Sequence, residues 1–378
     1  MDIDAPLVLL GGLSPATFMR RHWQKKPLLV RQAIAPAQPP ITRSALFELA
    51  GQQGVEARLL TRTDGRWKLR HGPFTRRALP PLNRPDWTLL VQGLDLHVPA
   101  AHELLSQFRF VPEARLDDLM VSYATPGGGV GPHLDSYDVF LLQVQGHRRW
   151  RIGPVADRSL VDGLPVKILR HFEPSEEWLL APGDMLYLPP LWGHDGVALD
   201  ECMTCSIGFR ASTASELAQQ LLPRLAEDIE PPSRDALYRD ATQPATAEPG
   251  RVPEALRGFA LAALMRVLDD PRALDRALGS LISEPKPQVW FDAGEALPQA
   301  PAALVLDRRT RMVYDDHHVF INGEAFAASG RDARLMRQLA DQRRLPATAL
   351  RQLGEGARDL LDDWAQAGWL HAEETLNV

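Results

Sequence analysis

A histidine and an aspartate two positions apart, behind a glycine-rich stretch, most constrain how this chain of 378 residues can fold. The pair is His133 and Asp135, and residues 127–131 just before it include four glycines. So many glycines disfavour a regular helix or strand, and the stretch predicts a loop that leads into the pair. Because side chains two apart on a strand lie on the same face, both groups could reach one metal ion.

A third candidate ligand, His194, lies 61 positions after His133. Two imidazoles and one carboxylate form the facial triad that binds non-haem Fe(II) and leaves coordination positions open. The His-x-Asp pattern alone is weak, because the chain has 11 histidines and 48 acidic residues, and two polar residues at a strand start are the alternative. The surrounding sequence favours a metal site. An apolar strand is predicted at 137–146, and a Pro-Gly-Asp turn followed by a strand that ends at His194 is predicted from 180–190. We predict that His133, Asp135 and His194 are the metal ligands and the catalytic centre.

Further blocks of sequence surround these candidate ligands. They are HWQKKPL at 22–28, WKLRHGPF at 67–74, WTLLVQ at 87–92, DDLMVS at 117–122 and the stretch 127–140. Together with the ligand set, they resemble the bacterial ribosomal oxygenases, which are Fe(II)- and 2-oxoglutarate-dependent hydroxylases related to the jumonji-C enzymes. The resemblance extends over essentially the whole chain and weakens after about residue 212.

The resemblance and the residue pattern together predict an α+β multidomain protein. We expect a double-stranded β-helix (cupin/jumonji-C) barrel with N-terminal decorations over residues 1–212, where short strands are separated by Gly and Pro. A helical dimerisation bundle over 213–284, with a linker containing Pro231 and Pro232, is implied by the resemblance. These amphipathic helices could alternatively pack on the barrel or on each other. Residues 285–378 are expected to form a winged-helix-like domain.

Strands and helices of the C-terminal region follow from periodicity. Residues 303–306 and 312–314 predict a strand pair, and 319–326 a hairpin around an Asn-Gly turn. Three short helices are expected at 331–339, 348–353 and 357–367. Residues 285–378 hold 11 Lys and Arg against 14 Asp and Glu, so this domain is not expected to bind DNA directly.

The resemblance also implies a reaction. It is hydroxylation of an arginine side chain of a large-subunit ribosomal protein, the sixteenth, with Fe(II), O2 and 2-oxoglutarate, releasing succinate and CO2. Three alternatives stay open: a jumonji-type enzyme acting on histidine or another protein residue, a cupin isomerase or small-molecule dioxygenase, and a non-catalytic ribosome-assembly binding protein. The oxidised carbon and its stereochemistry do not follow from the sequence.

Two further roles can be assigned to individual residues. The family has a basic residue just after the strand 139–145, so Arg148 is the candidate for the distal carboxylate of 2-oxoglutarate, with Arg149 as the alternative. A guanidinium group can bind a carboxylate through two parallel hydrogen bonds. Asp118 is the candidate for binding the substrate guanidinium, and Tyr137 and Ser206 could line the same opening. A solvated acidic pair is the alternative for Asp118 and its neighbour Asp117.

Composition limits location and partners. A net charge of −6 argues against a general nucleic-acid binder. No run of 18 apolar residues predicts a membrane span, and the acidic N-terminus is unlike a secretory signal, so a cytoplasmic protein is expected. Cys202 and Cys205 could indicate zinc or redox chemistry. Their odd separation on a strand instead predicts buried thiols on opposite faces.

Overall fold

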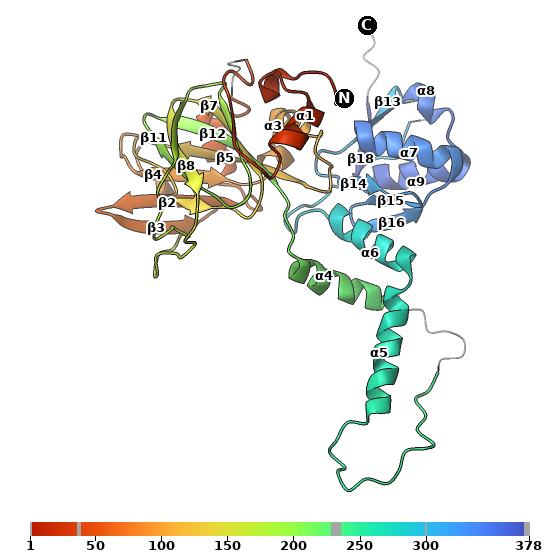
Figure 1. Cartoon of the computed structure of the whole chain (residues 1–378). Coiled ribbons are helices and arrows are strands. Elements are labelled where there is room, and N and C mark those ends of the chain that lie inside the picture. The colour runs from red at the N-terminus through yellow and green to blue at the C-terminus, as the bar shows by residue number, and fades with distance from the viewer. Residues whose placement is uncertain (1, 36–38, 228–235, 299–300, 374–378) are drawn as a thin grey trace. The chain divides into compact units, whose positions relative to one another are not determined.

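The computed structural model describes residues 2–35, 39–227, 236–298 and 301–373 (Figure 1). It divides into two compact units, Met1–Ala211 and Ser212–Val378. Pro231 and Pro232 of the expected linker lie outside the described residues. Within the described ranges, no helix combines the length and the apolar character that crossing a membrane requires.

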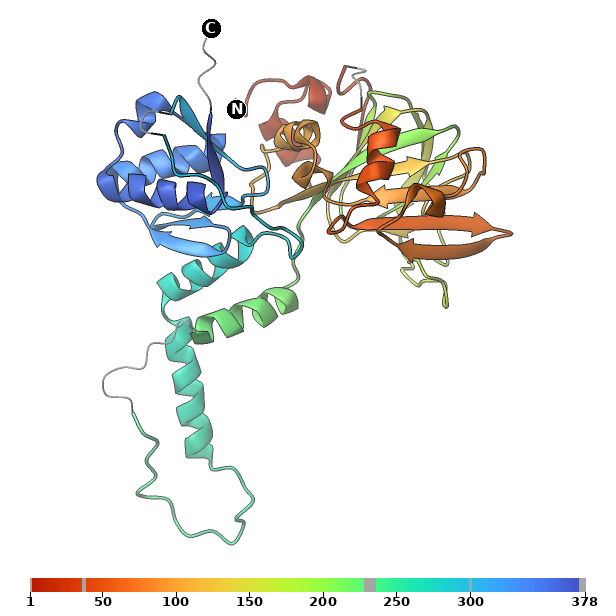
Figure 2. The same ribbon diagram turned by 180° about the vertical axis from the view of Figure 1, so that it is seen from behind.

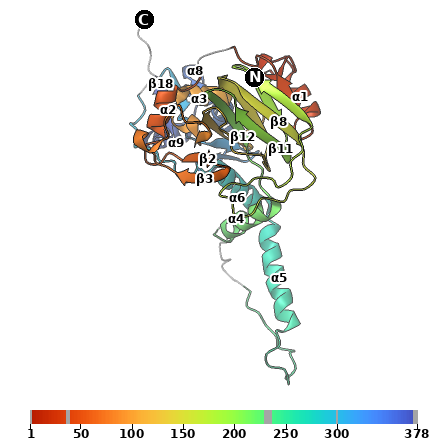
Figure 3. The ribbon, with the colours of Figure 1, turned by 90° about the vertical axis from the view of Figure 1, so that its left-hand side faces the viewer.

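Two antiparallel sheets form unit 1, as the barrel prediction requires. The large sheet has the strand order β1 (Leu28–Val30), β10 (Met185–Leu188), β7 (Val139–Gln145), β12 (Cys202–Phe209), β5 (Leu116–Ala124), β4 (Trp87–Val91), β2 (Ala57–Thr63), β3 (Arg66–His71). The small sheet has the order β6 (His133–Leu134), β11 (Trp192–Ala198), β8 (Arg148–Pro154), β9 (Glu176–Leu180). Figure 2 shows the large sheet from its β2–β3 edge, and Figure 3 shows unit 1 from the side of β8 and β11. The predicted cupin-type barrel is confirmed.

Short helices occur in the N-terminal half of unit 1, before and between the first strands. They are η1 (Val8–Leu10), α1 (Pro15–Arg21), α2 (Arg43–Leu49), η2 (Arg76–Ala78), η3 (Leu94–Leu96) and α3 (Pro99–Ser106). Helix α1 begins at a proline, and the Ser14 hydroxyl accepts a hydrogen bond from the Thr17 amide at 3.2 Å. Phe18 of α1 is fully buried, with its ring centroid 5.4 Å from Phe140 and 4.9 Å from Tyr187. This aromatic cluster attaches the N-terminal segment to the large sheet.

The two cysteines lie on β12 and are both free and buried. Cys205 belongs to the main core of unit 1, whereas Cys202 packs with Ala124 and Ala198. Burial raises the pKa of the Cys205 thiol, which keeps it protonated. The expectation of structural thiols on opposite faces is confirmed.

Unit 2 begins with the helices α4 (Ala214–Glu227), α5 (Glu254–Leu268) and α6 (Pro271–Ser283). A winged-helix domain follows. Its elements are β13 (Ala303–Leu306), β14 (Met312–Tyr314), β15 (His318–Ile321), β16 (Glu324–Ala327), α7 (Gly330–Gln342), β17 (Arg344–Pro346), α8 (Ala347–Leu350), α9 (Glu355–Gln366) and β18 (Leu370–Glu373). Helix α6 packs against β15, where a Cβ on Gly279 would lie 2.2 Å from the Phe320 ring. Glycine at this position therefore permits the close contact between helix and strand.

The strands of this domain test the predicted pairings. The Asn-Gly hairpin is confirmed: Ile321 pairs with Glu324, and Asn322 and Gly323 have φ of 49° and 93°. The predicted pairing of 303–306 with 312–314 is wrong, because β13 pairs with β17 and β18, and β14 pairs with β15. Periodicity identifies a strand but not its partner, and the partners of β13 lie much later in the chain.

Asp307, directly after β13, is a buried carboxylate whose ionisation should stabilise unit 2. Burial alone would raise its pKa, but hydrogen bonds from Arg309 and His371 outweigh burial and lower the pKa to about 2. A depressed pKa stabilises the fold above the unfolded-state value and loses that contribution as the pH falls from about 4 toward 2. We expect Asp307→Asn to lower the unfolding free energy near neutral pH by about 2 kcal/mol.

Native-state hydrogen exchange of the β13 and β18 amides at a series of pH values would measure this effect. The stability difference between wild type and Asp307→Asn should shrink as the pH falls through that window. Asp316→Asn, at an exposed carboxylate, is the control and should show little difference at any pH. A difference for Asp307→Asn that does not change with pH would contradict the assignment.

Candidate metal centre and active site

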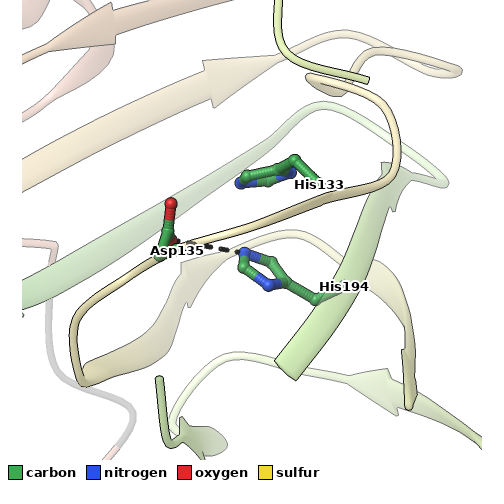
Figure 4. Close-up of side chains that lie close together, drawn as sticks. All are labelled: His133, Asp135 and His194. Carbon is green, nitrogen blue, oxygen red and sulfur yellow. Dashed lines mark ion pairs between the residues drawn. The ribbon is translucent and has the colours of Figure 1, made fainter. Parts of the chain in front are cut away.

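The register of the small sheet brings the two candidate histidines together. Strands β6 and β11 are antiparallel, and His133 lies directly opposite His194, with their ring centroids 4.1 Å apart. Asp135 follows β6, and its Oδ2 lies 3.6 Å from Nε2 of His194 (Figure 4). One ligand atom from each of the three side chains lies within 4.8 Å of the others. This spacing suits a shared metal ion.

Glycines before His133 permit the approach of this segment to the barrel. A Cβ on Gly128 would lie 2.5 Å from the Trp87 carbonyl oxygen, and a Cβ on Gly129 would lie 2.5 Å from that of Gly196. The Ala198 amide donates to the Gly128 carbonyl at 2.9 Å, which ties the segment to the end of β11. The glycine-rich stretch thus packs backbone against backbone, where no side chain fits.

Hydrogen bonds select the tautomer of both imidazoles. Nδ1 of His133 lies 2.9 Å from the Gly131 carbonyl, and Nδ1 of His194 lies 3.0 Å from the Trp192 carbonyl. Because a carbonyl only accepts, each Nδ1 carries the proton and each Nε2 lone pair is available to a metal. Burial, followed by the nearby His133, lowers the pKa of His194 to about 4, so this imidazole is neutral at pH 7. Neutral imidazole is the form that ligates metals.

The local strand arrangement around these ligands differs from the expectation. Strand β6 ends at Leu134, so Asp135 lies just beyond it, and β10 ends at Leu188 rather than at His194. Two prolines end β10, and Leu191, with φ of 66°, turns the chain into a separate strand, β11. The Leu191 amide donates to the Asp135 carbonyl at 2.7 Å, so this turn fixes the position of Asp135.

A cavity of ≈ 550 Å³ opens at the three side chains. Strands of both sheets and the loop before β9 line it, and the sequence candidates for cosubstrate and substrate binding are all among the lining residues. Those candidates are Arg148, Asp118, Tyr137 and Ser206. The cavity is large enough for a small dicarboxylate beside an inserted side chain.

Arg148 is buried in this cavity with hydrogen-bonding capacity unused. Its side chain is 4% exposed, and Nη1 donates to the Ser122 hydroxyl at 3.1 Å. Nε and Nη2 have no partner among the described residues, although buried guanidinium donors are ordinarily satisfied. Arg149 faces the other side of β8 and does not line the cavity. Arg148 therefore presents donors for an anionic ligand.

Asp118 lies at the same cavity and is held by a hydrogen-bonded chain. Nε2 of Gln92 donates to its Oδ2 at 2.7 Å, and Nη2 of Arg58 donates to Oε1 of Gln92 at 2.9 Å. Asp118 is 2% exposed, so it is not the solvated carboxylate of the alternative interpretation. Asp117 also lines the cavity, and its Oδ1 lies 3.5 Å from Nε of Arg210.

Ser122, Gln92 and Arg58 were not assigned roles from the sequence. Ser122 shares a face of β5 with Asp118, because every second side chain of a strand points to the same side and residues 118, 120 and 122 follow that spacing. This spacing could have indicated from the sequence that Ser122 lies at the site. Arg58 and Gln92 come from a distant part of the chain, and no local pattern connects them with Asp118.

Comparison with known families agrees with this geometry. The JmjC domain family matches residues 103–217, which include all three clustered side chains, and the ROXA-like winged helix family matches residues 266–371. A double-stranded β-helix with this ligand set defines the class of JmjC oxygenases.

Individual proteins of similar sequence indicate which family of JmjC enzymes the chain belongs to. The chain is 33% identical over 331 residues to the ribosomal protein uL16 3-hydroxylase of Escherichia coli strain K12, covering 84% of this chain and 86% of that protein. It is 39% identical over 210 residues to a probable ribosomal oxygenase of Haemophilus influenzae, covering 54% of this chain and 52% of that protein. The chain belongs to the ribosomal oxygenases, a family of JmjC enzymes that use 2-oxoglutarate and Fe(II).

A solved structure extends the similarity to three dimensions. The ribosomal oxygenase YcfD of Escherichia coli, in complex with cobalt and 2-oxoglutarate, superposes with a TM-score of 0.80 at 29% identity. The match covers 94% of this chain and 97% of that one. The similarity therefore includes the barrel as well as unit 2.

Proposed function

We propose that this enzyme hydroxylates an arginine side chain of a large-subunit ribosomal protein in the cytoplasm, releasing succinate and CO2. One observation carries the proposal: a single cavity contains the His133, Asp135 and His194 cluster, the unsatisfied guanidinium of Arg148 and the buried carboxylate of Asp118. The relative named as a uL16 hydroxylase supports a ribosomal protein as the substrate.

His133, Asp135 and His194 would hold Fe(II), since their spacing and their neutral Nε2 atoms fit such an ion. Arg148, oriented by Ser122, would bind the distal carboxylate of 2-oxoglutarate and satisfy its unpaired donors. The ion and the cosubstrate supply the oxidising chemistry when bound. The chain's own contribution is to orient both molecules and to keep water out of the cavity.

The substrate side of the cavity suits a guanidinium group. Asp118 supplies a buried negative charge, which Gln92 orients, and Ser206 and Tyr137 add hydroxyl groups. Burial, and then Asp135 and Asp118, raise the pKa of Tyr137, so its hydroxyl stays protonated and can donate. A planar cation with several donors can use these groups more fully than a neutral imidazole can.

Asp118→Asn tests this substrate assignment. We expect kcat/KM for an arginine-containing substrate peptide to fall about 30-fold or more, because the charge pair with the guanidinium is lost. The KM for 2-oxoglutarate should change little. Gln92→Leu should give a smaller loss in the same direction, because it removes only the hydrogen bond that orients Asp118. Asp64→Asn, at an exposed carboxylate that does not line the cavity, is the control, and an equal loss in that variant would contradict the role of Asp118.

The proposed substrate itself can be tested with purified large-subunit ribosomal proteins. Incubation with the enzyme, Fe(II), 2-oxoglutarate and O2, followed by mass spectrometry, should show the gain of one oxygen atom on an arginine. Oxidation of a histidine would favour the alternative hydroxylase. No oxidation of any residue would favour a binding protein or a small-molecule enzyme.

A homodimer is the further part of the proposal, and helix α5 supports it. Its apolar side chains lie in solvent: Leu261 is 55% exposed, Leu264 63% and Met265 47%. No residue of α5 is buried, although an apolar helix surface of this kind requires a partner. A second copy of α5 would supply a surface of the same character, as in a two-fold symmetric interface.

A further inference from the structure

Positive charge is concentrated in one segment of unit 1. Residues 58–84 contain eight Lys and Arg and one acidic residue, whereas the whole chain has 42 and 48. The segment comprises most of β2, all of β3 and the loop that follows. Its exposed cations, which we call the basic hairpin surface, are Arg62, Arg66, Lys68, Arg70, Arg76, Arg77 and Arg84.

The basic hairpin surface and the cavity share the same two strands. β3 is the edge strand of the large sheet, and the tip of the β2–β3 hairpin projects beyond the rest of the barrel (Figures 1 and 2). Arg66, Lys68 and Arg70 alternate along one face of β3. Leu60 and Leu69, paired with each other on the opposite face, line the cavity. These three cations face away from the cavity, whereas Arg62, paired with Trp67, lies on the cavity-facing side of the hairpin. Because β3 is the edge strand, an RNA strand that passes over this edge would reach the rim of the active site.

Few acidic groups neutralise this charge. Arg62 pairs with Asp86 at 2.7 Å, while Arg66, Lys68 and Arg77 have no ion-pair partner in the described part of the chain. Lysine and arginine on an edge strand can serve only to prevent aggregation. That role does not account for Arg76, Arg77 and Arg84, which lie outside the strand.

The positive charge expected of a ribosomal protein argues against that protein as the ligand of the basic hairpin surface. Proteins that bind RNA are positively charged, so a free ribosomal protein would be repelled by this surface. RNA phosphates would be attracted. Trp67, half-buried on the cavity-facing side of β3 with the Arg62 guanidinium 5.6 Å from its ring, adds an aromatic group of the kind found in RNA-binding sites. The overall negative charge of the chain does not oppose this, since electrostatic attraction is local at physiological salt.

We propose that the basic hairpin surface binds the RNA backbone next to the substrate side chain, so that the enzyme recognises the ribosomal protein together with its RNA. The identity of that RNA rests on the proposed function, whereas the binding of RNA phosphates does not. A protein–RNA particle would place its phosphates on the hairpin while the side chain to be oxidised enters the cavity.

Fluorescence anisotropy with a labelled single-stranded RNA tests the surface in the full-length protein. The triple variant Arg66→Glu, Lys68→Glu, Arg77→Glu should weaken RNA binding tenfold or more, and the slope of log affinity against log salt should flatten by about two. The matched control is Arg21→Glu, Lys26→Glu, Arg158→Glu, which reverses three exposed cations elsewhere in unit 1 and should retain binding. Equal weakening in both triple variants, or no salt-dependent binding by wild type, would overturn the proposal.

Turnover separates this inference from the proposed function. The triple hairpin variant should hydroxylate a short substrate peptide at the wild-type rate, which also shows that it folds. It should act more slowly than wild type on the ribosomal protein bound to RNA. Equal rates on that particle, or tighter binding of polyglutamate than of RNA, would overturn the inference. Failure of wild type to oxidise the peptide would instead count against the proposed function.

Discussion

His133→Ala is expected to reduce peptide-dependent succinate formation by a factor on the order of a thousand, since the three ligands act as a unit. The Nε2 of His133 is set for a metal by the hydrogen bond of its Nδ1 to Gly131. Without the His133 imidazole, His194 and Asp135 would supply only two ligands, and the affinity for Fe(II) should fall together with turnover.

His171→Ala is a matched control, because His171 is exposed and does not line the cavity. It should retain the wild-type Fe(II) affinity and rate. If His133→Ala kept a substantial part of either property, His133 would not be a ligand.

Arg148→Met is expected to raise the KM for 2-oxoglutarate about 100-fold, because truncating one partner of a buried charge pair costs about 2–5 kcal/mol. Nε and Nη2 of Arg148 are the unsatisfied donors that a carboxylate would use. The variant should fold at least as stably as wild type without ligands, because methionine removes a buried charge with two unsatisfied donors and no ion-pair partner among the described residues.

The neighbouring Arg149→Met provides the comparison. Arg149 occupies the opposite face of β8, so its loss should leave the KM for 2-oxoglutarate within about twofold of wild type. A steep rise in Arg149→Met and none in Arg148→Met would mean that the strand presents the other guanidinium to the cosubstrate.

The sequence predicted that His133, Asp135 and His194 lie together, because their chemistry is carried by a short pattern. Two imidazoles and a carboxylate form a specific set, and the glycines before His133 indicate a close backbone approach. The pattern could not predict that Asp135 lies beyond β6 or that His194 lies within β11. Those details depend on the turn at Leu191, whose amide bonds to Asp135.

Residues that act through others were harder to predict. Gln92, just after β4, orients Asp118, and Arg58 of β2 holds Gln92; only the pairing of β4 with β2 and β5 brings them together. Likewise, β13 pairs with strands that follow it at a distance, and periodicity carries no information about such partners. Local chemistry was thus predictable, whereas long-range pairing was not.

An anomalous-scattering map tests whether His133, Asp135 and His194 share one metal ion, with crystals grown without oxygen, with Mn(II) in place of Fe(II) and with 2-oxoglutarate. We expect one anomalous peak per chain within bonding distance of these three side chains, and a 2-oxoglutarate carboxylate on Arg148. A peak at other side chains, or a dicarboxylate bound away from Arg148, would contradict this expectation.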